Sequence, residues 1–233
     1  MFIRIQKYLS HLGVCSRRTA EKWIEQGKIK LNDKTVTEMG ILVDPKKDNI
    51  LIKGKPLKTT PLSPEYIIYN KPKGVVCTTR HFKNQKNIFE ILPFKKKLII
   101  AGRLDQDTEG LVLLTHDGAL AHQLTHPRFK RVKKYEVITH KPINVKDLIA
   151  MKKGILIKKV AYKIADFILH SPKKCGVTLK QGKKREIRIL FQHQGYSIQK
   201  LKRVQLHTLK LGKLKTGEYR RLSPKEIKKL KLS

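Results

Sequence analysis

Three carboxylates stand close together in a chain that has few of them. Asp105, Asp107 and Glu109 fall within five positions, whereas the 233 residues include only 18 acidic residues against 53 basic ones. Short apolar runs at residues 98–101 and 111–114 flank these carboxylates, and continuous runs of this kind are typical of buried strands. The sequence therefore predicts a loop that presents acidic side chains from two rigid strands, an arrangement that suits a catalytic group.

Carboxylates at this spacing could also bind a metal ion. The residues from 105 to 110 have the form of the start of a calcium loop, but His116 occupies the twelfth position, where calcium requires a bidentate Glu. The flanking segments have the pattern of strands instead of helices, so we exclude calcium. A magnesium site on Asp105 and Asp107 stays open, and so does an acidic turn that only pairs with neighbouring lysines.

Two motifs carry a family resemblance. Gly-Arg-Leu-Asp-x-x-Thr-x-Gly-Leu at residues 102–111 resembles the signature loop of the pseudouridine synthases that modify ribosomal RNA. The resemblance implies that Asp105 is the catalytic carboxylate and that Arg103 binds substrate. Asn-Lys-Pro-Lys-Gly, which follows a predicted strand, resembles the first signature of the same family. It implies that Lys71 binds substrate beside the catalytic loop.

Two further segments resemble the same family. Lys-x-Tyr at the start of a predicted strand implies that Tyr135 packs on the target uracil, although a strand tyrosine can equally be a core residue. Residues 182–191 resemble the third signature and open a predicted helix, on which Arg188 matches the arginine that pairs with the catalytic Asp. Arg185 shares its helix face and is expected to bind substrate. Glu186 stands where the family usually has Gln, so the contacts of this helix with the substrate strand stay open.

The N-terminal residues resemble the small RNA-binding domain named after ribosomal protein S4. Helical spacing of apolar residues predicts two short helices, and Ser16 is expected to cap the second. Arg17 and Arg18 fall on the open side of that second helix, where they would bind RNA phosphates.

The domain organisation follows from these segments. We expect an S4-type domain at residues 1–58, a linker at 59–64 with two prolines, and a catalytic domain at 65–233. The fold class is α+β: a small α/β RNA-binding domain, then a pseudouridine synthase domain on a mixed, mostly antiparallel sheet with flanking helices. In the second part the pattern predicts a strand over 162–169 and a basic strand near 203–211.

Composition limits the partners and the compartment. A formal net charge of +35 indicates a polyanionic partner, which we expect to be ribosomal RNA or a ribosomal assembly intermediate. The three cysteines have no metal-binding spacing, so we expect reduced thiols in the cytoplasm. No apolar run reaches membrane-spanning length, and we expect a monomer that does not bind membranes.

The resemblance implies isomerisation of a uridine to pseudouridine in ribosomal RNA, in particular that of the large subunit. The nucleotide would be flipped out of its helix, and Arg188 would keep Asp105 ionised. Asp107 and Glu109 are assigned to loop structure. An internal isomerisation needs no cofactor and no metal ion, and we expect neither. Two other functions stay open: a non-catalytic RNA-binding or ribosome-assembly protein on the same fold, and a metal-dependent nucleic-acid hydrolase.

Overall fold

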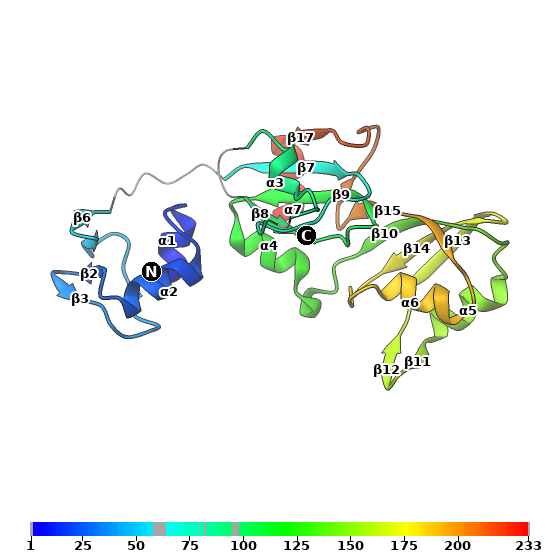
Figure 1. Cartoon of the computed structure of the whole chain (residues 1–233), viewed down its shortest axis with the longest axis horizontal. Helices are drawn as coiled ribbons and strands as arrows, with labels where there is room; N and C mark the ends of the chain where they lie inside the picture. The colour runs from blue at the N-terminus through cyan, green and yellow to red at the C-terminus, as the bar shows by residue number, and fades with distance from the viewer. Residues whose placement is uncertain (1, 58–63, 82, 95–97, 233) are drawn as a thin grey trace. The chain divides into compact units, whose positions relative to one another are not determined.

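The computed structural model describes residues 2–57, 64–81, 83–94 and 98–232 and divides into two units, Met1–Pro64 and Glu65–Ser233 (Figure 1). The predicted linker at 59–64 lies outside the described residues except for Pro64, so its boundaries stay a prediction. No helix in the described part of the chain is long and apolar enough to cross a membrane.

The first unit contains two helices and short strands. They are β1 (Ile3–Arg4), α1 (Ile5–His11), α2 (Arg17–Glu25), β2 (Ile29–Leu31), β3 (Lys34–Thr35), β4 (Leu42–Val43), β5 (Ile50–Ile52) and β6 (Lys55–Pro56). The Ser16 hydroxyl accepts a hydrogen bond from the backbone N–H of Thr19 at 3.1 Å and caps α2 as expected. Ala20 and Ile24 point from α2 into a small apolar core, whereas Arg17 and Arg18 are exposed.

A nine-stranded sheet organises the second unit. Its central order is β13-β14-β10-β15-β9-β7-β17. In addition, β8 pairs with β9 and β16 pairs with β15. These strands are β7 (Tyr66–Lys71), β8 (Ile99–Ala101), β9 (Glu109–Thr115), β10 (Lys133–Thr139), β13 (Asp166–Ser171), β14 (Lys174–Leu179), β15 (Ile198–Leu206), β16 (Leu209–Lys210) and β17 (Tyr219–Arg221). The pair β9–β15 is parallel and the other described pairs are antiparallel. This is the mixed, mostly antiparallel sheet that the sequence predicted.

Helices cover both faces of this sheet. One face packs against α3 (Ile88–Ile91), α5 (Val145–Lys153) and α6 (Glu186–His193), and the other against α4 (Gly118–Thr125) and α7 (Pro224–Leu232). Burial on both faces explains the continuous apolar runs of β7 and β9, in which alternate residues belong to opposite cores. A hairpin of β11 (Ile155–Ile157) and β12 (Val160–Tyr162) projects from the body of this unit (Figure 1).

Two predicted strands were wrong in extent. The strand expected over 162–169 is interrupted because Ile164 turns into the core and its backbone N–H bonds to the carbonyl of Met151 on α5 at 3.1 Å. The basic strand expected near 203–211 starts earlier, at Ile198, and folds back as a hairpin after Leu206, where His207 has a positive φ of 54°.

Candidate active site

The acidic loop lies between β8 and β9, as the apolar runs predicted. Gly110 lies where parallel strands β9 and β15 meet, with a φ of +106°. A Cβ there would lie 2.3 Å from the backbone oxygen of Arg203, so only glycine fits this close approach. Within the loop, the N–H of Thr108 bonds to the carbonyl of Asp105 at 3.1 Å and closes a tight turn. The carboxylate of Asp105 is thereby presented from a short, fixed segment.

The buried side chain of Lys71 anchors this loop through hydrogen bonds to backbone carbonyls and does not face the solvent. Its side chain is fully buried, and its ammonium donates to the carbonyls of Pro72 at 2.9 Å, Val75 at 2.8 Å and Gln106 at 3.2 Å. It therefore joins the first signature segment to the acidic loop. Burial lowers the pKa of Lys71, and nearby carboxylates, Asp107 among them, partly counter that effect. The predicted substrate contact was wrong, because a side chain without solvent exposure cannot reach RNA.

Arg203 holds the other side of the loop. Its side chain is 1% exposed. The guanidinium donates to the carbonyl of Leu111 at 2.7 Å and also to the carbonyl of Gly102. These two carbonyls lie at opposite ends of the acidic loop, so one side chain from β15 fixes its width. The sequence prediction missed this residue, although period-two counting from the apolar Leu201 would have placed it on the buried face of β15.

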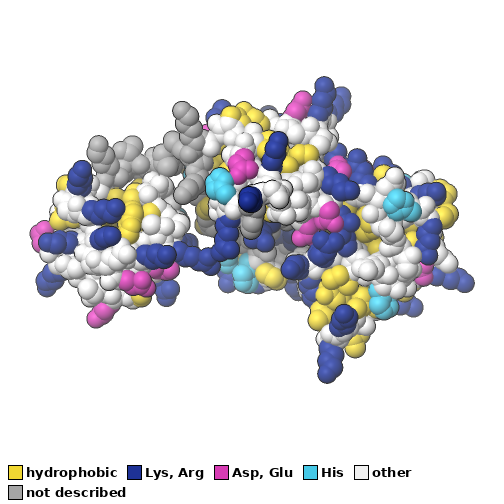
Figure 2. Space-filling view, in the orientation of Figure 1, with side chains coloured by type: hydrophobic (Ala, Val, Ile, Leu, Met, Phe, Trp, Pro, Cys, Tyr) yellow, Lys and Arg dark blue, Asp and Glu magenta, His cyan; other side chains and the backbone are white. Residues whose placement is uncertain are grey.

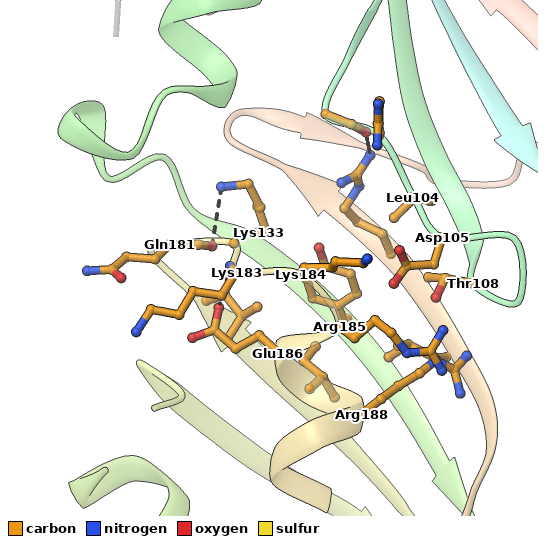
Figure 3. Close-up of a pocket in the computed structure, with 18 of the residues that line it drawn as sticks. Leu104, Asp105, Thr108, Lys133, Gln181, Lys183, Lys184, Arg185, Glu186 and Arg188 are labelled. Carbon is orange, nitrogen blue, oxygen red and sulfur yellow. Dashed lines mark hydrogen bonds between the residues drawn. The ribbon is translucent and has the colours of Figure 1, made fainter. Parts of the chain in front are cut away.

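A cavity of about 540 Å³ opens over the loop. It brings together most of the residues that sequence reasoning selected: Arg103, Asp105, Tyr135, Arg185 and Arg188. Figure 3 shows Asp105 on one wall and the guanidinium groups from the start of α6 on the facing wall. In all, seven cationic side chains line this cavity against the two carboxylates of Asp105 and Glu186, which makes it a site for an anionic ligand.

The ion pair at the centre of the site differs from the expected one. The Nε of Arg188 lies 3.1 Å from Oδ2 of Asp107, and its second nitrogen donates to the backbone carbonyl of Asp107 at 2.8 Å. Arg185 adds a contact of 3.3 Å to the same carboxylate. The expected pairing of Arg188 with Asp105 was therefore wrong: the neighbouring carboxylate on the loop takes the arginines. Asp105 is left facing the cavity, close enough to Arg188 for their charges to interact. Burial lowers the pKa of Arg188, and the negative charges of Asp107 and Asp105 partly counter that effect.

Tyr135 lies on β10 at the floor of the cavity. Strand pairing places it opposite Arg203 on β15, and Arg203 is itself opposite Gly110 on β9. The tyrosine is 9% exposed and belongs to the larger apolar core, so it packs in the core and also lines the cavity. The structure therefore supports the core role of Tyr135, and its packing on the target uracil stays a prediction.

A lysine and a glutamate border the far end of the cavity. Lys133 donates to the carbonyls of Arg131 and Gln181, both at 3.3 Å; the second bond is dashed in Figure 3. Burial and the charge of Arg203 lower the pKa of Lys133. Glu186 is 4% exposed and accepts the N–H of Lys183 at 3.0 Å, while burial raises the pKa of its carboxyl. The family-atypical Glu186 therefore fastens the loop before α6 and does not extend into solvent.

The two N-terminal arginines that the sequence selected do not line this cavity. Arg17 and Arg18 belong to the first unit and not to the cavity's lining. Among the residues that the structure describes, no group of three or more His, Cys, Asp or Glu side chains is placed to hold a metal ion.

Comparisons with known proteins agree with the described fold. Residues 65–193 match the family model of the RNA pseudouridylate synthases, and residues 3–49 match the S4 domain. Ribosomal large subunit pseudouridine synthase B of Bacillus subtilis is 37% identical, over 98% of this chain and 95% of its own. An RNA pseudouridine synthase of Aquifex aeolicus is 35% identical, over 99% and 94%. A crystal structure of a pseudouridylate synthase superposes with a TM-score of 0.71 at 30% identity, covering 98% of this chain and 99% of that one.

The chain belongs to the RNA pseudouridine synthase family. The family match covers the loop of Asp105 and the start of α6, and the S4 match covers the two N-terminal helices. Both resemblances read from the sequence are confirmed.

Proposed function

We propose that this enzyme converts a specific uridine of ribosomal RNA to pseudouridine, with Asp105 as the catalytic carboxylate. The observation that carries the proposal is the position of Asp105. It is a half-buried carboxylate on a loop fixed by two buried cations, and it faces a cavity with seven cationic side chains. The names of relatives support the substrate, since one is a large-subunit enzyme of Bacillus subtilis and another a dual-specificity RNA pseudouridine synthase of Escherichia coli, 33% identical over 97% of this chain.

The reaction needs a nucleotide outside its helix. Flipping a base costs a few kcal/mol, which contacts between phosphates and the cations of the cavity offset. Arg103 and Arg185 are exposed at the cavity and have the forked donors that suit phosphates. Tyr135 offers the uracil a stacking surface at the cavity floor.

Asp105 then acts on the ribose, either as a nucleophile at C1′ or as a base toward the 2′ proton. The bond from C1′ to N1 breaks, the uracil turns, and a bond from C1′ to C5 forms. The hydrogen of C5 is released as a proton and N1 gains one, so the exchange balances without a cofactor. Arg188, held by Asp107, places positive charge near the carboxylate of Asp105.

The two units divide the work in this proposal. Arg17 and Arg18 on α2 bind RNA phosphates and position the substrate, while residues 65–233 carry the chemistry. We also propose that the enzyme acts as a monomer in the cytoplasm, on ribosomal RNA or an assembly intermediate.

The proposal is tested by the paired variants Asp105→Asn and Asp107→Asn. Tritium release from ribosomal RNA labelled at uridine C5 measures turnover, because the reaction frees that hydrogen. Asp105→Asn should abolish release while RNA affinity changes less than about twofold, since the change removes one charge from a site with seven cations. Asp107→Asn should lower the rate by less than about tenfold, because ion pairs between partly exposed side chains contribute only about 0–1 kcal/mol. Normal turnover by Asp105→Asn would refute its assignment.

A further inference from the structure

A second cavity of about 860 Å³ lies beside the first. Its rim carries six lysines: Lys130, Lys152, Lys153, Lys163, Lys180 and Lys183. Apolar side chains, among them Ile155, Tyr162 and Ile164, also line this cavity. The one acidic residue in its lining is Glu186, which is buried. We call this cavity the lysine groove. Cations around an apolar floor fit a ligand with negative charges along its length and flat apolar parts between them.

The groove is continuous with the proposed active site. Gln181, Lys183 and Glu186 line both cavities. Figure 3 shows the side chain of Lys183 directed away from Asp105. Its amine donates to the carbonyl of Ala161 on β12 and lies 5.2 Å from the centre of the Tyr162 ring. A ligand that leaves the active-site cavity on this side therefore enters the groove directly.

The projecting β11–β12 hairpin forms one side of the groove and has an unusual tip. Lys158 and Lys159 have φ of 49° and 63°, the left-handed conformation that both turn residues adopt in a type I′ hairpin. Asparagine, aspartate and glycine are the residues that adopt it at low cost. The hairpin of β2 and β3 has Asn32 and Asp33 with the same signs of φ.

Both residues of this turn are lysines, although the conformation disfavours them, and the turn carries two adjacent positive charges. Both are exposed, and Leu156, on the same hairpin, is 71% exposed. In Figure 2 the projecting segment shows a hydrophobic patch with dark blue side chains at its end. Each residue held in this conformation costs about 1–3 kcal/mol of folding free energy, and such residues are concentrated at functional sites.

We propose that the lysine groove and the Lys158–Lys159 tip bind the RNA strand that continues from the target uridine. The proposal rests on the proposed function, because the strand is defined by the nucleotide in the active-site cavity. Phosphates contact the lysine rim and tip, and sugars and bases contact the apolar floor. An acidic peptide would find the same cations but has no flat rings for the floor.

The test measures RNA binding by three variants of the full chain. The first removes the groove charges (Lys153→Gln, Lys163→Gln and Lys180→Gln). The second replaces the tip with favoured turn residues (Lys158→Asn and Lys159→Gly). The control removes three exposed lysines that line neither cavity (Lys213→Gln, Lys225→Gln and Lys228→Gln). Oligouridylates of three and twelve nucleotides serve as probes, each titrated between low and high salt.

The longer probe should distinguish the variants. Each phosphate contact with a single strand contributes about 0.7 to the slope of log affinity against log salt. The groove variant should therefore lose about 2 from that slope for the twelve-nucleotide probe, and the tip variant about 1.4. Affinity for the three-nucleotide probe should change less than twofold. The tip variant should also melt no earlier than the unmodified chain, since its turn is relieved of strain.

Two results would overturn the proposal. One is an equal loss of affinity in the control variant, which would make the groove an ordinary part of a basic surface. The other is an equal loss of affinity for polyglutamate, which would show no preference for a nucleotide strand. Because binding is measured without turnover, an enzyme that forms no pseudouridine would refute the proposed function and leave this result standing.

Discussion

Lys71→Met would remove the buried ammonium that anchors the acidic loop while nearly keeping the length of the side chain. Three backbone carbonyls lose the ammonium as a hydrogen-bond donor. The carbonyl of Gln106 still accepts a hydrogen bond from the N–H of Gly74 at 2.8 Å. The carbonyls of Pro72 and Val75 are left without this donor. An unsatisfied buried acceptor costs about 1–3 kcal/mol, so two cost about 2–6 kcal/mol. An apolar side chain recovers about 1–2 kcal/mol of burial. Together these ranges give an expected net loss of unfolding free energy of about 0–5 kcal/mol, with about 2.5 kcal/mol at their midpoints.

Chemical denaturation of the purified chain, monitored by circular dichroism, measures this loss. The matched control is Lys73→Met, two positions along the same segment, where the lysine is exposed; it should change the free energy of unfolding by less than about 0.5 kcal/mol. Turnover should fall in Lys71→Met even at temperatures where it is fully folded, because the loop is no longer held. A stable, fully active Lys71→Met would refute the anchoring role.

The same variant has a pH signature. Burial lowers the pKa of Lys71 below its ordinary 10.5, so the unfolded chain binds this proton more tightly than the folded chain. Stability from this group therefore rises as the pH increases from the lowered pKa toward 10.5. Lys71→Met lacks that rise, and its deficit relative to the unmodified chain should grow across this range. A deficit that shrinks with pH would contradict the assigned shift.

Substitutions at two other positions test the frame of the site. Gly110→Ala should lower the free energy of unfolding by about 2–6 kcal/mol, because backbone strain costs about 1–3 kcal/mol and the clash with Arg203 another 1–3 kcal/mol. The control Gly217→Ala, at φ +85° with open space around it, should lose only the strain energy, and thermal melting measures both losses. Tyr135→Phe should retain RNA affinity and lose turnover if the ring stacks on uracil. Tyr135→Ala should destabilise by about 3–5 kcal/mol; a variant that melts early yet turns over normally per folded molecule would leave Tyr135 only a core role.

Much of the fold could be predicted because local pattern and burial agree. The runs in β7 and β9 are apolar at every position since both sheet faces are covered, and the helix caps Ser16 and Asp117 lie where their side chains can accept a backbone N–H. Residues of the acidic loop, of the Lys-x-Tyr strand and of the third signature segment meet in one cavity because β8, β10, β15 and α6 all contribute to its lining.

Other features depend on contacts between distant segments. A lysine beside a proline is usually an exposed turn, and nothing local shows that Lys71 is enclosed by the acidic loop. Spacing likewise cannot decide which of two carboxylates, Asp105 or Asp107, an arginine on another element meets. The strand predicted over 162–169 failed for the same reason, since the inward turn of Ile164 is set by its bond to α5.

The parallel pairing of β9 with β15 has a consequence for synthesis of the chain. The bond between Arg203 and the carbonyl of Leu111 spans 92 residues, and that from Asn70 to the carbonyl of Leu214 spans 144. A ribosome must therefore translate almost the whole chain before the centre of the sheet can close. Until then β9 is paired with β7 and β8 but lacks β15, and the acidic loop lacks one of its two anchors, Arg203. Such long-range closure is slow and exposes unpaired strand edges, so the nascent enzyme remains inactive, and most open to aggregation, until its last strands emerge.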